Sequence, residues 1–198
     1  FVPQIRNQGI RVIDFSADYR LNDQLIYEEW YGIDHTDPSR MPNTVYGLPE
    51  RYRDLIRGAN LVANPGCYPT TSILPSIPII SKQLVELDQI IIDAKSGISG
   101  AGSKPKDTTH YPNRESNLVA YGLASHRHTP EIEQELSAIN GDKIIVNFTP
   151  HLVPMTRGIL TTLYLKLKQP MSTQDLLDIY ADLYQQDRKS TRLNSSPW

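Results

Sequence analysis

A single cysteine stands at a predicted junction between a strand and a helix. The segment Ala63-Asn64-Pro65-Gly66-Cys67 ends a short apolar stretch, turns at Pro-Gly and leads into a longer apolar run. Backbone N–H groups at a helix start carry partial positive charge, which favours a thiolate and the oxyanion formed when it attacks a carbonyl carbon. The alternative is a buried cysteine that packs as a small hydrophobic residue. The segment therefore makes Cys67 a candidate nucleophile.

Two histidines provide a candidate acid and base for that thiol. In an extended segment His126 and His128 point to one side and Arg127 points to the other. One imidazole can accept the proton of the thiol and later donate it. A histidine pair also suits a metal ion, but no third ligand stands at a recognisable spacing, and no metal site is predicted. The alternative is a polar turn whose histidines bond nearby carbonyl groups.

A loop of small residues, 96–103, directly follows a strong apolar stretch. Gly97 and Gly100 would let the backbone approach a ligand, and serines such as Ser96 can bond phosphate or amide groups. The loop has neither the Gly-Lys-Ser/Thr ending of a Walker loop nor the G-x-G-x-x-G spacing of a dinucleotide loop. A flexible turn is the alternative interpretation of this loop.

Other polar residues have ordinary surface roles as their default interpretation. Asp14, Asp18 and Arg20 cluster after the first apolar stretch, where a surface ion pair is expected. His35 and His110 stand in polar loops and are expected to be solvated.

The elements that must position these residues interleave along the chain, which predicts an α/β or α+β sheet domain. Strands are expected at 9–15, 61–64, 89–95, 143–149 and 158–168, and helices at 23–31, 68–84, 129–140 and after 172. Residues 33–60 are expected to be mostly loop, and 104–116 a polar, mobile excursion. Pro75 and Pro78 predict a kink or an irregular turn within the second helix.

Composition narrows the class of protein. The chain has 198 residues, a formal net charge of −2 and 39% hydrophobic residues, which is typical of a soluble globular protein. This balance gives no basic field for nucleic acid, and no apolar run approaches the roughly 20 residues of a membrane span. One cysteine allows no internal disulfide and suits a reducing compartment, so a cytoplasmic location is expected. The sequence has no signal peptide and starts without Met, as a chain that begins mid-protein would.

Six ordered motifs resemble those of the N-acetyl-gamma-glutamyl-phosphate reductase family, the NADP-linked reductases of arginine biosynthesis. The similarity covers most of residues 9–186, and one motif alone would not be specific. The matching stretches are Asp14-Phe15-Ser16-Ala17-Asp18-Tyr19-Arg20-Leu21, Val45-Tyr46-Gly47-Leu48-Pro49-Glu50, Ala63–Thr70, Ser96–Gly102, His126-Arg127-His128-Thr129-Pro130-Glu131-Ile132 and Phe148–Gly158.

The resemblance implies a fold and a reaction. It predicts a remnant of a nicotinamide-binding Rossmann domain at 1–66, a mixed-sheet catalytic and oligomerisation domain at 67–187, and a tail at 188–198 that is disordered or foreign to the fold. The implied reaction is the NADPH-dependent reductive dephosphorylation of N-acetyl-L-glutamyl 5-phosphate to the 5-semialdehyde through a cysteine thioester. A thioester divides a difficult reduction into two easier steps.

The resemblance also assigns roles to residues. It implies that Cys67 is the nucleophile and His126 the acid/base, with His128 in a supporting or substrate-facing role. The expected partners are a small acyl phosphate and further copies of the chain, and the expected cofactor is NADPH. The remaining site residues implied are Asn64, Arg20, His128 and Arg127 for substrate, and Ser16, Ser96, Gly97 and Gly100 for cofactor.

Two departures from the family pattern limit these expectations. The family's glycine-rich strand-turn-helix and its C-terminal part are both missing, so the sequence is interpreted as a fragment lacking both ends, with little turnover of its own. Two other functions stay open. One is a related acyl-phosphate semialdehyde dehydrogenase with another substrate, such as aspartyl phosphate or a carrier-bound aminoadipate analogue, and the other is a non-catalytic assembly module.

Overall fold

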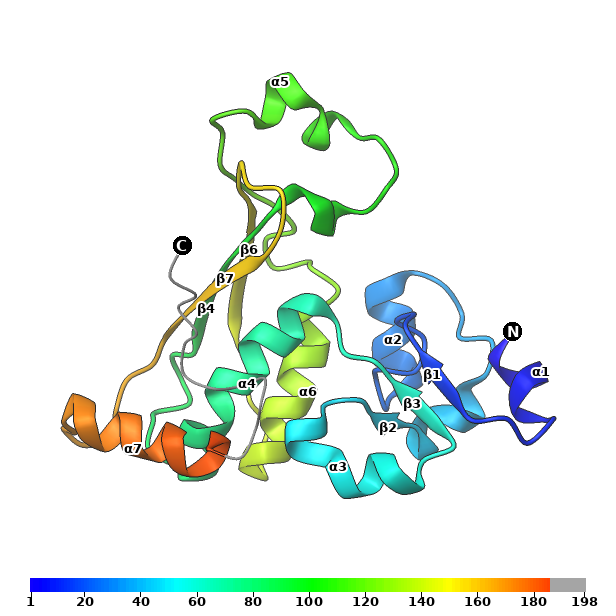
Figure 1. Ribbon diagram of the computed structural model, residues 1–198, viewed down its shortest axis with the longest axis horizontal. Helices are drawn as coiled ribbons and strands as arrows, with labels where there is room; N and C mark the ends of the chain where they lie inside the picture. The colour runs from blue at the N-terminus through cyan, green and yellow to red at the C-terminus, as the bar shows by residue number, and fades with distance from the viewer. Residues whose placement is uncertain (186–198) are drawn as a thin grey trace.

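The computed structural model describes residues 1–185, so the predicted tail at 188–198 lies outside the described part. The chain forms two β-sheets with helices between and around them, which confirms the α/β class (Figure 1). Within residues 1–185, no helix has both the length and the apolar character that crossing a membrane requires.

The first sheet has three short parallel strands in the order β1-β3-β2. These strands are β1 (Val12–Asp14), β2 (Val45–Tyr46) and β3 (Leu61–Ala63). Because all three run in parallel, the loops after β1 and β3 leave the same edge of the sheet, where α/β proteins place their ligands. The surrounding helices are α1 (Val2–Arg6), α2 (Gln24–Tyr31), the 3₁₀ segment η1 (Pro38–Asn43) and α3 (Pro49–Gly58).

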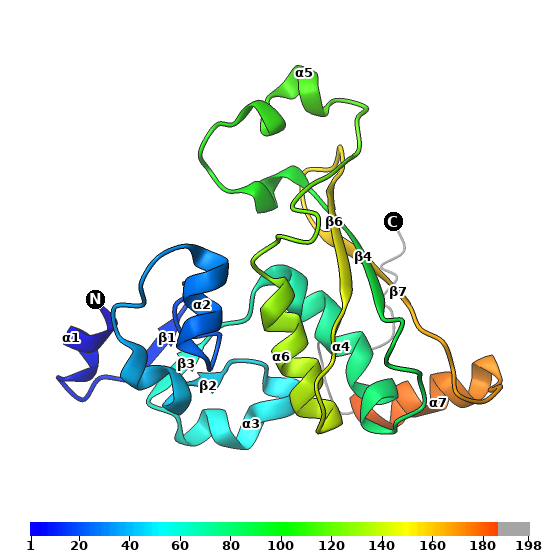
Figure 2. The same ribbon diagram turned by 180° about the vertical axis from the view of Figure 1, so that it is seen from behind.

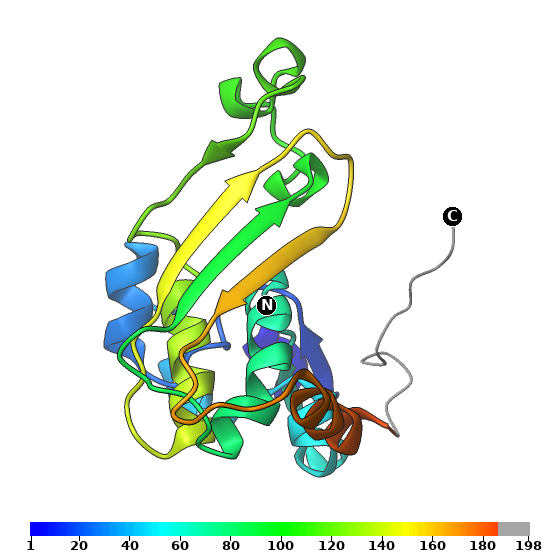
Figure 3. The same ribbon diagram turned by 90° about the vertical axis from the view of Figure 1, so that its left-hand side faces the viewer.

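The second sheet has four strands in the order β5-β6-β4-β7. They are β4 (Ile91–Ser96), β5 (Val119–Ala120), β6 (Asn147–Leu152) and β7 (Ile159–Tyr164). β4 pairs in parallel with β6 and antiparallel with β7, so the sheet is mixed as predicted. Figure 3 shows β6 (yellow), β4 (green) and β7 (orange) side by side. The chain between β4 and β5, here called the excursion, extends beyond the sheet and contains η2 (Ile98–Ala101), η3 (Asp107–Thr109) and α5 (Tyr111–Arg114).

Two helices lie between the sheets and contribute to the larger core cluster. They are α4 (Cys67–Ser81) and α6 (Thr129–Asn140), which lie next to each other in both views (Figures 1 and 2). Ile73 and Ile132 on these helices, like Ile92 on β4, have no exposed surface. The same core cluster includes Tyr46 from the first sheet. The burial of these apolar side chains therefore fixes the position of both helices relative to both sheets.

The helix α4 continues through Pro75 and Pro78, where the sequence predicted a kink or an irregular turn. Pro78 has no N–H to donate to the carbonyl of Leu74, four residues before it. The last described helix, α7 (Thr173–Tyr184), supplies a replacement, because the Tyr184 hydroxyl donates to the Leu74 carbonyl at 2.5 Å. A tertiary contact thus offsets part of the cost of proline inside the helix.

The expectation that residues 33–60 are mostly loop is wrong for α3. This helix begins at Pro49, whose fixed φ suits the first helical position. Two of its side chains bond to α6: the Tyr52 hydroxyl donates to Glu135 at 2.7 Å, and Arg51 donates to the Ala138 carbonyl at 2.9 Å. Contacts with a helix far along the chain therefore stabilise a segment whose local composition indicates a loop.

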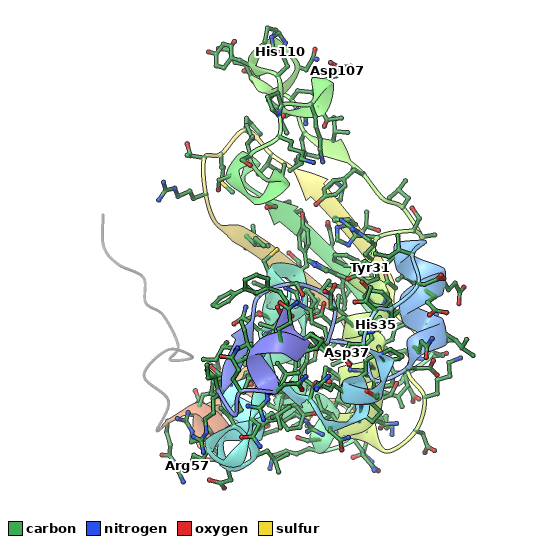
Figure 4. The ribbon with its side chains drawn as sticks, turned by 90° about the vertical axis from the view of Figure 1, so that its right-hand side faces the viewer. Tyr31, His35, Asp37, Arg57, Asp107 and His110 are labelled. Atoms are coloured by element: carbon green, nitrogen blue, oxygen red, sulfur yellow. The ribbon has the colours of Figure 1, made fainter. Side chains whose placement is uncertain are left out.

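His35 is also not solvated, contrary to its predicted surface role. It is 7% exposed, accepts the Asp37 N–H at Nδ1 (3.0 Å), and has Nε2 2.7 Å from the Asp18 carbonyl. With Nδ1 accepting, Nε2 must carry the proton. Figure 4 shows His35, Asp37 and Tyr31 close together, whereas His110 lies at the outer end of the excursion. His110 is exposed, as expected.

Candidate active site

Cys67 is the first residue of α4 and is exposed. The first N–H groups of a helix have no partner inside the helix. Here the Gly66 N–H donates to Glu131 and Pro69 has no N–H, while the N–H groups of Cys67 and Tyr68 have no hydrogen-bond acceptor among residues 1–185. Two donors beside the thiol are therefore free to bind an oxyanion.

The turn that carries Cys67 is held by a buried carboxylate from α6. Glu131 is 1% exposed, and its Oε1 accepts the Gly66 N–H and the Tyr46 hydroxyl, both at 2.8 Å. Burial raises the pKa of Glu131, while Arg20 and the two donors act in the opposite direction. Glu131 thus joins the first sheet, the Cys67 turn and the histidine-bearing end of α6.

Arg20 completes this connection from the loop after β1. Its Nε donates to the Asn64 carbonyl at 2.8 Å, and its Nη1 lies 3.7 Å from Glu131 Oε2. The ion pair of Arg20 is therefore with a buried residue of α6, and the expectation of a surface pair with Asp14 or Asp18 is wrong. Asn64 itself bonds through Nδ2 to the carbonyl of the adjacent Pro65.

The two histidines lie together in front of the α4 start. Their ring centroids are 4.9 Å apart, and both rings contact Tyr68 edge-on, at 5.4 Å for His126 and 6.0 Å for His128. A Cβ placed on Gly66 would lie 2.7 Å from His128 Nε2, so this imidazole borders the Cys67 turn directly. His126 Nδ1 accepts the His128 N–H at 3.1 Å, which leaves Nε2 of neutral His126 as a donor.

Both imidazoles are neutral at pH 7. Burial, and then the charge of Arg127, lowers the pKa of His126 to about 4. Burial, His126 and the arginines Arg20 and Arg127 lower the pKa of His128 to about 3. Each ring is therefore an unprotonated but weak base at neutral pH, and an anion bound beside the arginines would raise its pKa and make protonation easier.

These groups line one cavity, whose volume of about 500 Å³ suits a small substrate. Cys67, His126, His128, Arg20, Arg127 and Gly100 all line it, so the structure brings six of the residues predicted for the site together. Asn64, Ser16, Ser96 and Gly97 are not in its lining. Further lining residues that the sequence analysis did not select are Ala17, Tyr31, Lys106, Arg114, Tyr121 and Ser125.

The four residues predicted to bind cofactor occupy different settings. Ser16 is exposed after β1 and bonds to Asp14 through its hydroxyl at 2.6 Å. Ser96 is buried and donates to the Gly97 carbonyl at 3.0 Å. A Cβ on Gly97 would lie 2.7 Å from the Arg157 backbone, so a close approach by the β6–β7 connection requires glycine there. Gly100 is exposed and lines the cavity.

Glu131 and Arg114 are the main residues of this site that sequence reasoning missed. Glu131 had a signal, because it belongs to the matched His126–Ile132 motif, but an acidic residue in a first helical turn has an ordinary electrostatic explanation. Arg114 had none, because it lies in a polar segment whose local pattern predicts solvent exposure. The structure buries Arg114 to 4% exposure.

Replacing Gly66 with alanine should disturb the thiol and His128 together. The new Cβ would lie 2.7 Å from His128 Nε2 and 3.0 Å from Glu131 Oε2, so at least one of these groups must move. We expect a loss of about 1–3 kcal/mol in the free energy of unfolding and slower iodoacetamide labelling of Cys67. Gly58→Ala is the matched control, since a Cβ there meets nothing within 4 Å. Equal stability and labelling in the two variants would contradict this packing.

The two site histidines should stay neutral well below pH 6.5. In a pH titration followed by NMR, their ring signals should begin to shift only below about pH 5, because their folded pKa values are about 4 and 3. The unfolded chain protonates both near pH 6.5 and binds more protons, so these imidazoles destabilise the fold as pH falls through 6.5 toward 4. His126→Asn and His128→Asn assign the signals. Titration of either ring near pH 6.5 in the folded protein would contradict this result.

Comparison with known proteins places this site in a family. Residues 67–196 match the family model described as semialdehyde dehydrogenase, dimerisation domain, and the match begins at Cys67. The chain belongs to the semialdehyde dehydrogenase family. The match covers α4, the second sheet and the excursion.

Two curated relatives of the chain share one name, which confirms the family resemblance that the six sequence motifs predicted. N-acetyl-gamma-glutamyl-phosphate reductase of Methanococcus vannielii is 50% identical over 94% of the chain and 53% of its own length. The protein of that name from Lachnoclostridium phytofermentans is 52% identical over 90% of the chain and 51% of its own length. The chain thus spans about half the length of the curated relatives it matches.

Solved structures show the same semialdehyde dehydrogenase fold. Aspartate semialdehyde dehydrogenase II from Vibrio cholerae has a TM-score of 0.66 at 18% identity, covering 91% of the chain and 56% of its own. Aspartate semialdehyde dehydrogenase with NADP from Candida albicans has a TM-score of 0.52 at 12% identity, covering 91% of the chain and 51% of its own. Identities this low support the shared fold only.

Proposed function

We propose that the chain is part of an N-acetyl-gamma-glutamyl-phosphate reductase, which converts N-acetyl-L-glutamyl 5-phosphate into the 5-semialdehyde with NADPH. The observation that carries this proposal is the exposed Cys67 at a helix start, with two unbonded N–H groups beside it and two neutral histidines in the same cavity. The names of relatives at about 50% identity supply the substrate class.

In the first half-reaction, the Cys67 sulfur forms a bond to the acyl carbon and the bond from that carbon to the phosphate oxygen breaks. The products are a thioester on Cys67 and free phosphate. The N–H groups of Cys67 and Tyr68 stabilise the oxyanion of the tetrahedral intermediate. His128 borders the thiol turn through Nε2, and this nitrogen accepts the thiol proton in the proposal.

His126 acts as the proton donor in this proposal. Its Nδ1 is occupied by the His128 N–H, so the neutral ring presents an Nε2–H. That hydrogen can bond to the substrate carbonyl oxygen or to the departing phosphate. Arg20 and Arg127 line the same cavity and would offset the negative charge of phosphate. Phosphate would in turn raise the pKa values of both imidazoles, which burial and, to a smaller extent, the charge of Arg127 lower.

The described residues fit the nicotinamide end of NADPH. Ala17 follows β1 at the carboxyl edge of the first sheet, Gly100 belongs to the small-residue loop, and both line the cavity that holds Cys67. A Cβ on Gly100 would lie 2.8 Å from Ser96 Oγ, so glycine lets the loop pack closely against the end of β4 at that wall. When bound, NADPH supplies the hydride that reduces the thioester. Cys67 then leaves as the thiolate, and the same helix N–H groups stabilise its charge. His128 returns the proton that it accepted, which restores the thiol.

The acylation half-reaction tests this function without cofactor. The chain is mixed with N-acetyl-L-glutamyl 5-phosphate, and released phosphate and intact mass are recorded. The proposal expects one phosphate per chain and one hydroxylamine-sensitive adduct on Cys67. Aspartyl phosphate in parallel distinguishes the related dehydrogenase, which would acylate faster with that donor. Absence of any adduct with either donor would refute the catalytic role and leave the non-catalytic assembly module.

The second sheet also supports association with a second copy of the chain. One face of this sheet packs on α4 and α6, while the opposite face exposes Ile91, Leu160 and Tyr164 by 42%, 63% and 53%. These side chains share a face, because Ile91 pairs with Tyr164 and Lys95 with Leu160 in the register of β4 and β7. At the centre of this face, Asp93 contacts both Lys95 and His151. We propose that a second copy covers this face.

Replacing Leu160 with glutamate should weaken that association. A charge on the exposed apolar face would have to be desolvated in a dimer, so the dissociation constant should rise at least about 10-fold. Sedimentation velocity over a concentration series measures this change. Leu55→Glu is the matched control, since Leu55 is 61% exposed on α3, away from this sheet. Equal dissociation constants for both variants would place the interface elsewhere.

A further inference from the structure

The excursion holds one buried cation in an otherwise exposed segment. Arg114 is the last residue of α5 and is 4% exposed, whereas its neighbours Asn113 and Glu115 are exposed. Local sequence does not explain this inversion, because arginine is rarely buried without an anionic partner.

That partner is missing from the described chain. The Nε and Nη1 atoms of Arg114 are buried and have no hydrogen-bond partner within residues 1–185, and no ion pair joins Arg114 to an acidic residue there. An unpaired buried guanidinium is strongly unfavourable, while an oxyanion that accepts its N–H bonds removes the penalty. The geometry therefore indicates a ligand that carries negative charge.

The location of Arg114 shows where that ligand would lie. Arg114 lines the cavity that contains Cys67, and it also lines an adjoining cavity of about 720 Å³ beside Tyr111 and Met155. Of the other cations that line the cavity, Lys106 is exposed, while Arg20 and Arg127 come from elements next to the thiol and the histidines. Arg20 and Arg127 suit the phosphate on the reacting carbon, and the buried Arg114 is left for a different negative group of the same substrate.

We propose that Arg114 binds the α-carboxylate of the acyl substrate and thereby selects amino-acid-derived acyl phosphates. A guanidinium forms short, charge-assisted hydrogen bonds with a planar carboxylate, which fixes orientation as well as adding affinity. This assignment rests on the proposed function. It adds a specificity-determining residue from the excursion, a segment whose predicted site residues are Gly97 and Gly100 alone.

Two ligands that differ only in the α-carboxylate test the assignment without turnover. N-acetyl-L-glutamate and 4-acetamidobutyrate each protect Cys67 from iodoacetamide, and the concentration for half-protection is measured. The native chain should prefer N-acetyl-L-glutamate by about 10-fold or more, the usual value of a hydrogen bond to a charged group. Arg114→Gln should abolish this preference, Arg114→Lys should restore part of it, and the exposed Arg53→Gln should leave it unchanged.

The remaining outcomes overturn the assignment. An unchanged preference in Arg114→Gln would show that another group binds the carboxylate. If protection by inorganic phosphate is lost in Arg114→Gln while the preference persists, Arg114 belongs to the phosphate subsite. Failure of the proposed function is visible separately, as the absence of phosphate release when the native chain meets the acyl phosphate. Circular dichroism of each variant confirms that the fold is retained.

Discussion

Replacing Cys67 with serine should abolish acylation of the chain by N-acetyl-L-glutamyl 5-phosphate. A serine hydroxyl is far less acidic than a thiol, and the neutral His128, with a pKa of about 3, is too weak a base to activate it. We expect the rate of phosphate release to fall by at least about 10³-fold. The measurement is phosphate release in the first turnover, with intact mass spectrometry to locate the adduct.

The same variant should keep its stability. Cys67 is exposed at the helix start, and its backbone N–H has no acceptor within residues 1–185. The change to serine therefore breaks no hydrogen bond of that N–H. The urea midpoint should therefore match that of the native chain. Because the sequence has one cysteine, no second thiol can replace it. Persistence of a stoichiometric, hydroxylamine-sensitive adduct in Cys67→Ser would remove the thiol from the mechanism.

Replacing Glu131 with alanine should cause the largest loss of stability at the site. The change leaves the Gly66 N–H and the Tyr46 hydroxyl buried without their acceptor and leaves Arg20 without its anionic partner. We expect a loss of about 3–5 kcal/mol in the free energy of unfolding, as is usual when one member of a buried pair is removed. Urea unfolding followed by circular dichroism measures this loss.

Two further variants separate the parts of this effect. Glu131→Gln keeps an oxygen acceptor for Gly66 and Tyr46 while removing the charge, so it should lose less stability than Glu131→Ala. Glu29→Ala changes an exposed residue on α2 and should have almost no effect. Iodoacetamide labelling adds a second measurement, since a displaced Gly66 turn should slow labelling at Cys67. A loss below about 1 kcal/mol for Glu131→Ala would show that the turn is fixed by other contacts.

Local sequence was sufficient where the determining forces are local. Pro-Gly followed by an apolar run identifies the start of α4 and so the setting of Cys67. The helix predicted at 23–31 is α2, whose ends are set locally: Asp23 accepts the N–H groups of Leu25 and Ile26, and Gly32 adopts a left-handed conformation. The apolar run at 89–95 likewise predicts the strand β4, although only alternate residues of that strand are buried in the structure.

Only the tertiary structure decided which distant groups share an environment. Glu131, Gly66, Tyr46 and Arg20 come from four separate segments, and no local pattern shows that one carboxylate joins them. The burial of Arg114 and the continuous helix through Pro78 depend in the same way on elements far along the chain. Caps and amphipathic periods depend on residues within one or two turns, whereas desolvation and the pairing of buried charges depend on the packed fold. The sequence by itself therefore indicated the candidate nucleophile and the elements around it, and the folded chain determined which charged and polar groups surround that residue.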